Sequence, residues 1–254
     1  MRTLFLLPLF ACSKPTLTVT GNDDFGDFGD IEQAYWTTSD VVDLFLYAGG
    51  AVEDIGPAAL DQSLRFYNED VSCGDYQDQT RAWADASSDL LDASSDGGDI
   101  DAFCAAMPDY LLAMADANAG VPVADRRFTI GFCVGDTCDE NLPEGSLEPG
   151  RNDDVYVSGT LAYQPDDPGE RYEQMAADWD MDACVDGSFS AASNVTYWYA
   201  EAGDVQIDAS SNRGIDGSFE LELVDDGGAP AGVISGEFEL PRCKGPDVER
   251  LLIF

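Results

Sequence analysis

Alternation of apolar and polar residues predicts β-strands over much of the chain. The pattern is clearest where Phe219, Leu221 and Leu223 alternate with glutamate, and it repeats in residues 236–240. Strands with one apolar and one acidic face are typical of antiparallel sheets that have one side in water. Two aspartates and two glycines at 225–228 predict a hairpin turn between these strands. Further strands are predicted at residues 41–48, 128–133, 155–163 and 195–199.

A helical pattern replaces this alternation in residues 57–118. Apolar residues recur there at steps of three and four, as on the buried face of an amphipathic helix. An acidic stretch at residues 92–99 interrupts the pattern, and Pro108 is expected to kink or split the helix that contains it. The predicted helices cover about residues 57–67, 76–92 and 100–118.

Together these elements predict an α+β fold in which an antiparallel β-sandwich or partly closed barrel carries a helical insert at about residues 57–118. Residues 31–254 are long enough to form one domain with a sizeable core. Residues 12–30 include an acidic, glycine-rich stretch and are expected to be a tether.

The charge of the chain is strongly negative, with 12 basic and 50 acidic residues and a net charge of −38. Such a field excludes nucleic acid and anionic membrane surfaces as partners, because both are bound through basic patches. Two interpretations remain open. The acidic residues form a solvated coat suited to a saline habitat, or some of them bind Ca²⁺.

The candidate Ca²⁺ site is formed by Asp92 and Asp96, which occupy the first and fifth positions of a loop that resembles an EF-hand. The twelfth position is Phe103 instead of the glutamate that such a loop requires. An acidic loop between two helices explains the same residues. No cofactor is expected, and Ca²⁺ is the one candidate.

Catalytic chemistry is restricted because the chain contains no histidine. This absence excludes Ser-His-Asp and Cys-His nucleophiles and every His-ligated metal site. A non-catalytic binding or structural role is therefore expected. The alternatives are a carboxylate-dependent glycan hydrolase and a Ca²⁺-dependent carbohydrate-binding module. Trp198, between Tyr197 and Tyr199, is the candidate for stacking on a glycan, although aromatic residues also favour strands for their packing.

The first residues, MRTLFLLPLFACSK, have the layout of a secretory signal, with Arg2 before a short apolar run. The ending Leu9-Phe10-Ala11-Cys12 resembles the lipobox of bacterial lipoproteins. The resemblance implies a signal peptide at 1–11, a diacylated Cys12, and a lipid anchor in the membrane. Because Ser13 stands where an aspartate retains such proteins at the inner membrane, the resemblance also implies an outer-membrane location. An envelope protein or a glycan is the candidate partner. The alternative is an ordinary secretory signal with Cys12 as a free thiol.

A repeated G-x-F-x-L pattern, at residues 217–221 and 236–240, resembles a β-rich module of bacterial surface lipoproteins. The cysteine count agrees with lipidation. The chain has seven cysteines, and assigning Cys12 to lipid leaves six for three disulfides in an oxidising compartment. Six cysteines allow about 15 connectivities, and pairing by sequence order is one of them. That pairing predicts Cys73–Cys104, Cys133–Cys138 and Cys184–Cys243.

Overall fold

A computed structural model describes residues 15–21, 28–48, 51–56, 60–93, 100–119, 121–122, 124–134, 142–152, 155–164, 167–186, 195–245 and 248–253. The helices in this part of the chain are α1 (Cys73–Ala93), α2 (Ile100–Asn118), α3 (Pro168–Ala177) and α4 (Met181–Val185). The strands are β1 (Thr16–Gly21), β2 (Gln33–Ala48), β3 (Ala51–Gly56), β4 (Leu60–Tyr67), β5 (Arg126–Val134), β6 (Gly145–Leu147), β7 (Gly150–Asn152), β8 (Val155–Tyr163), β9 (Thr196–Ser211), β10 (Gly214–Asp225), β11 (Pro230–Lys244) and β12 (Val248–Ile253).

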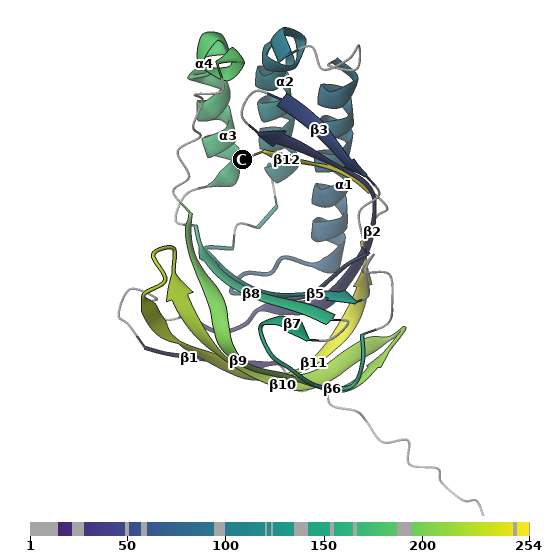
Figure 1. The fold of residues 1–254 in the computed structure, drawn as a ribbon, viewed down its shortest axis with the longest axis vertical. Helices are drawn as coiled ribbons and strands as arrows, with labels where there is room; N and C mark the ends of the chain where they lie inside the picture. Colours follow the sequence, from purple (N-terminus) through teal and green to yellow (C-terminus); the bar gives the residue numbers. More distant parts are fainter. Residues whose placement is uncertain are drawn as a thin grey trace, which may run out of the picture.

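The main sheet is a closed 7-strand barrel in the order β2-β4-β5-β8-β9-β10-β11 (Figure 1). Neighbouring strands are antiparallel except at the seam, where Arg242–Lys244 of β11 pairs in parallel with Trp36–Thr38 of β2. The other half of β11 pairs with β1, which lies within the stretch expected to be a tether. Beyond the barrel, the second half of β2 pairs with β3 and β12. The predicted α+β class with an antiparallel sheet is confirmed, and the sheet closes into a barrel.

Large apolar side chains fill the barrel interior. Leu64, Phe66, Phe128 and Ile130 point inward from the neighbouring strands β4 and β5, and each is fully buried. A barrel of about eight strands is just wide enough for its side chains to fill it. The interior is therefore a packed core, and a binding site must be sought outside it.

Packing across the β10–β11 pair explains the repeated G-x-F-x-L pattern. The register places Gly217 opposite Phe238 and Phe219 opposite Gly236. A Cβ added to Gly217 would lie 2.8 Å from Cζ of Phe238, and one added to Gly236 would lie 3.0 Å from Cζ of Phe219. Each phenylalanine ring therefore covers the glycine on the facing strand. The predicted hairpin between these strands is confirmed, with Asp225 Oδ1 accepting hydrogen bonds from the Gly227 and Ala229 amides.

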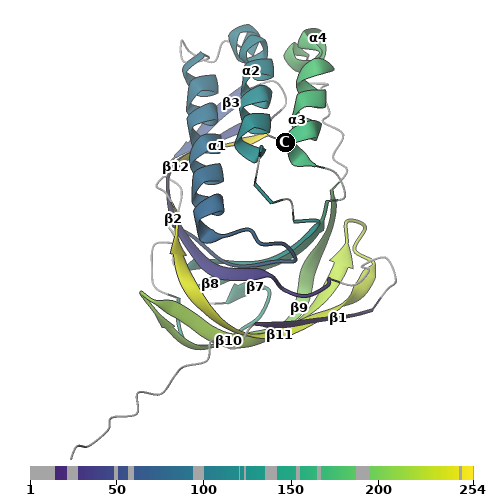
Figure 2. The same ribbon diagram turned by 180° about the vertical axis from the view of Figure 1, so that it is seen from behind.

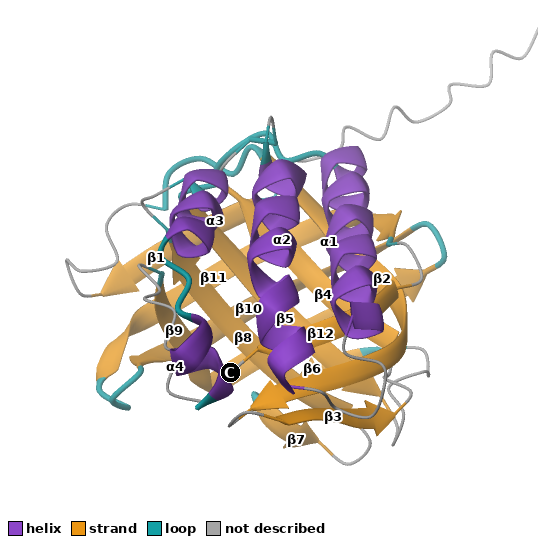
Figure 3. Ribbon diagram, turned by 90° about the horizontal axis from the view of Figure 1, so that it is seen from above, coloured by secondary structure: helices purple, strands orange, loops and turns teal. Residues whose placement is uncertain are grey.

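The helices α1, α2 and α3 lie side by side in one layer on one side of the barrel, with α2 in the middle (Figures 2 and 3). This layer has its own core, which contains Phe103, Cys104, Met107 and Cys184. At the start of α1, Ser72 and Asp75 cap each other: the Asp75 amide donates to Ser72 Oγ and the Ser72 amide donates to Asp75 Oδ2.

The helical segment differs from the prediction at its start. The helices predicted at 76–92 and 100–118 are found as α1 and α2, and α2 runs through Pro108 without a break. The helix predicted at 57–67 is wrong, because these residues contain strand β4. Leu60 and Leu64 share one face both of a helix and of a strand, and the other face carries Ser63 and Arg65. The face of β4 that carries Ser63 and Arg65 is covered by the helical layer. Both faces of the strand are therefore shielded from water, and the usual alternation of buried and exposed residues is lost. A second helical segment, α3 with α4, was not predicted.

Two of the predicted disulfide pairings are wrong. Cys73 pairs with Cys243, and Cys104 pairs with Cys184. The cause is topological. β11 returns to the seam beside β2, and this brings Cys243 to the start of α1. α4 lies beside the first half of α2, where Cys104 is located. Cys133 is also disulfide-bonded. Its predicted partner, Cys138, lies outside the described residues.

Candidate functional site

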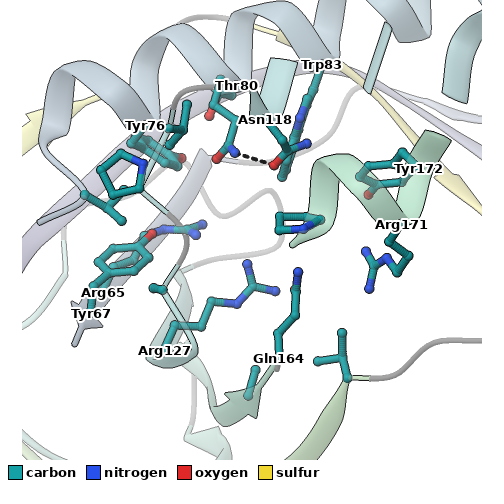
Figure 4. Close-up of a pocket in the computed structure, with 18 of the residues that line it drawn as sticks. Arg65, Tyr67, Tyr76, Thr80, Trp83, Asn118, Arg127, Gln164, Arg171 and Tyr172 are labelled. Carbon is teal, nitrogen blue, oxygen red and sulfur yellow. Dashed lines mark hydrogen bonds between the residues drawn. The ribbon is translucent and has the colours of Figure 1, made fainter. Parts of the chain in front are cut away.

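A pocket of about 290 Å³ lies between the helical layer and the outer face of the barrel (Figure 4). Its floor comes from β4, β5, β8 and β9, its roof from α1 and the end of α2, and one side from α3. Its volume is close to the lower end of the range for small-molecule sites, about 300–1,000 Å³. The lining residues are Arg65, Tyr67, Val71, Tyr76, Gln79, Thr80, Trp83, Asn118, Val121, Pro122, Ala124, Arg127, Ala162, Gln164, Pro168, Arg171, Tyr172, Val195 and Tyr197.

The charge of this lining is opposite to the charge of the whole chain. Arg65, Arg127 and Arg171 contribute to it, and none of its described residues is Asp or Glu. The full chain has 50 acidic and only 12 basic residues. Guanidinium groups keep their charge at any pH that proteins tolerate. The pocket is thus a local positive site within a strongly negative molecule.

Arg65 is held in place by polar groups of the barrel wall. Its Nε donates to Ser63 Oγ at 3.1 Å and to Thr37 Oγ1 at 3.4 Å, and both of these residues are buried. Its guanidinium lies over the ring of Tyr76, 4.8 Å from the centroid. The strand alternation that sends Leu64 and Phe66 into the barrel directs Arg65 outward, toward the helices.

Arg127 and Arg171 approach the same space from different elements. Arg127 extends from β5, where its neighbour Phe128 points into the barrel. Arg171 extends from α3, whose first turn is capped by Asp167. Figure 4 shows Arg127 and Gln164 rising from the strands toward the helices, and Arg171 reaching toward them from the side. Within the described chain, neither arginine forms an ion pair.

The roof of the pocket is held by a hydrogen bond between two helices. Gln79 Nε2 of α1 donates to Asn118 Oδ1 of α2 at 2.7 Å, and Asn118 Nδ2 donates to the Met114 carbonyl at 2.7 Å. Gln79 lies one turn from Tyr76 and from Trp83, which also line the pocket. The amide pair therefore fixes the position of α1 relative to α2 above the arginines.

A cluster of tyrosines connects this roof to the barrel. The ring of Tyr35 lies 5.6 Å from that of Tyr67 and 5.9 Å from that of Tyr76, measured between centroids. Burial, reinforced by Tyr67, raises the pKa of the Tyr35 phenol well above its ordinary value. Tyr35 therefore stays neutral and adds no negative charge beside the arginines.

These groups can bind an anion, but they offer little for catalysis. Arginine binds carboxylate and phosphate oxygens through paired N–H donors. The described lining contains no Asp, Glu or Cys that would serve as a general base or nucleophile. A glycan hydrolase needs two carboxylates about 5–10 Å apart, and this lining holds none.

The residues that the sequence suggested as sites lie elsewhere. Trp198 is only 5% exposed and belongs to the barrel core. Its ring therefore packs inside the barrel and does not lie on a surface where it could stack on a glycan, as the sequence had suggested. The tyrosines beside it face outward, and Tyr197 lines the pocket. Asp92 lies in the last turn of α1. Asp96 and Cys12 lie outside the described residues. Among the described residues, no three Cys, Asp or Glu side chains lie close enough together to hold a metal ion.

Sequence reasoning does not single out Arg65, Arg127 or Arg171. They come from three separate parts of the chain, and nothing in their spacing predicts that they meet. The available signal is their rarity: in a chain with so few basic residues, each arginine that flanks a predicted strand is a candidate for a specific role. Arg127 directly precedes the strand predicted at 128–133.

Comparisons with protein-family models, curated proteins and solved structures found no match to this chain. None of the described helices has the length and apolar character needed to cross a membrane.

Proposed function

We propose that this chain is a lipid-anchored, non-catalytic binding protein of the bacterial cell envelope, and that it binds a small organic anion in the arginine-lined pocket. The observation that carries the proposal is the lining itself, with three arginines and no described acidic residue in a chain of net charge −38. The lipid anchor at Cys12 and the outer-membrane location rest on the lipobox resemblance.

The charge arrangement supports selection of an anion by the pocket itself. The overall field repels anions at long range, but at about 0.15 M ionic strength this repulsion is screened over about 8 Å. The three arginines of the pocket are half-buried, so attraction to their guanidinium groups is stronger than at the open surface. The rest of the lining is mainly aromatic and apolar, which favours an organic anion over an inorganic one.

Three probes of similar size and different charge test this proposal. Benzoate, benzamide and benzylammonium would each be titrated into the full, disulfide-bonded chain at constant ionic strength, and thermal unfolding would be followed. We expect a saturable rise in Tm with benzoate alone, because a ligand that binds only the folded state stabilises it. Equal shifts with all three probes, or no shift with benzoate, would contradict the proposal.

A further inference from the structure

Two nitrogen donors in the pocket lining are buried and unpaired. Within the described structure, Trp83 Nε1 on α1 and Arg171 Nε on α3 have no hydrogen-bond partner. Both residues line the pocket. Buried donors in folded proteins nearly always have an acceptor, which is often supplied by water or a ligand. Two such donors in one lining indicate where a bound molecule would place its acceptor atoms.

The polar groups around Trp83 do not satisfy its indole N–H. The Asn118 oxygen, which also lines the roof, accepts from Gln79 and not from Trp83. Elsewhere in the helical layer, the indole of Trp179 shows the usual arrangement, donating to the Cys104 carbonyl at 3.0 Å. Trp83 thus differs from Trp179 in lacking an acceptor supplied by the protein.

The two unpaired donors belong to different walls. Figure 4 shows Trp83 at the helical roof, while Arg127 and Arg171 lie across the open space from it. Aromatic side chains, among them Tyr76, Tyr172 and Tyr197, complete the lining around this space. A volume of about 290 Å³ corresponds to about ten water molecules, so it suits a compact ligand.

We infer that the ligand is a small, flat organic anion with two recognition points: an anionic group bound by Arg127 and Arg171, and a second hydrogen-bond acceptor bound by Trp83 Nε1. This inference rests on the proposed function and specifies its ligand class. A donor left unpaired when the second acceptor is missing makes the site discriminate against ligands that lack it. Arg171 positions the anionic end through its Nε and terminal nitrogens.

Substituted benzoates of matched shape test the second recognition point. 4-Acetylbenzoate carries a carbonyl acceptor that 4-isopropylbenzoate replaces with a methyl group, and the 3-substituted pair covers the other ring geometry. Affinities would be measured by saturation-transfer NMR titration of the full chain. In at least one pair, we expect the acetyl compound to bind about fivefold to tenfold more tightly than the isopropyl compound. This is the difference in affinity that one additional hydrogen bond produces.

Trp83→Phe removes the N–H and keeps an aromatic ring. In this variant we expect the acetyl preference, measured as the ratio of the affinities for the two compounds, to disappear. Trp179→Phe is the matched control and should keep the preference. Thermal unfolding of each variant verifies that it is folded. The comparison of the acetyl and isopropyl compounds on the unmodified chain tests the inference even if a variant does not fold.

The outcomes separate this inference from the proposed function. If benzoate binds but neither acetyl compound is preferred, or if the preference survives in Trp83→Phe, the second recognition point is overturned and anion binding stands. If none of the benzoates binds, the proposed function fails and this inference fails with it.

Discussion

Replacing Cys73 and Cys243 together by alanine lowers the free energy of unfolding by about 2–5 kcal/mol, the usual cost of losing a native disulfide. The bridge joins positions 170 residues apart and therefore restricts a large part of the unfolded chain. It also links the first turn of α1 to the barrel seam, within a cluster that contains Tyr35, Tyr67 and Tyr76. Urea unfolding of the oxidised double variant and the unmodified chain measures the difference.

The other described disulfide provides the control. Cys104–Cys184 closes a separation of 80 residues inside the helical core, and neither cysteine lines the pocket. Replacing this pair should also lower stability while leaving benzoate affinity intact. Replacing Cys73 and Cys243 should weaken benzoate binding too, because α1 supplies the roof. Unchanged unfolding in urea for the Cys73/Cys243 variant would show that the bridge is not needed to hold the helices to the barrel.

Replacing Arg127 and Arg171 together by glutamine reduces benzoate affinity at least about a hundredfold. A hydrogen bond to a charged group contributes about 1.5–3 kcal/mol, and each 1.4 kcal/mol corresponds to about a tenfold change in affinity. Glutamine keeps a polar side chain of similar reach and removes the charge. Calorimetric or NMR titration with benzoate measures the effect.

A matched change in net charge away from the pocket separates local from overall electrostatics. Arg81 and Arg213 are exposed, and Arg81 forms a surface ion pair with Asp78 at 2.9 Å. Their double replacement by glutamine alters the net charge equally and should change benzoate affinity by less than about twofold, since exposed charges are largely screened. An equal loss in both double variants would assign anion binding to the overall field instead of the pocket.

The fold could be predicted where local pattern and burial agree. Strands β10 and β11 each present one face to the core and one to water, so the alternation and the turn at Asp225 identify them from sequence. α2 was equally clear, since its apolar residues follow the helical repeat. β4 was missed because the helical layer covers its outer face, where the polar residues Ser63 and Arg65 are buried and half-buried, respectively.

The site could not be predicted, because it depends on how distant segments meet. Arg65 and Arg127 come from adjacent strands, but their shared outer face becomes a pocket only when α1 and α3 cover it. α3 carries Arg171 and lies in a connection between β8 and β9 for which no helix was predicted. The disulfides were mispaired for a similar reason, since the parallel seam between β11 and β2 brings Cys243 beside Cys73 against the order of the sequence.

The central claim is that the arginine-lined pocket binds an organic anion, and locating a bound anion in the structure tests it most directly. Crystals of the full chain grown with 4-bromobenzoate would reveal the ring through the anomalous signal of bromine. We predict a bromine peak between α1 and the outer face of β5, with the carboxylate hydrogen-bonded to Arg127 and Arg171. Bromine found only at other surfaces, with the pocket free of the probe, would contradict the account.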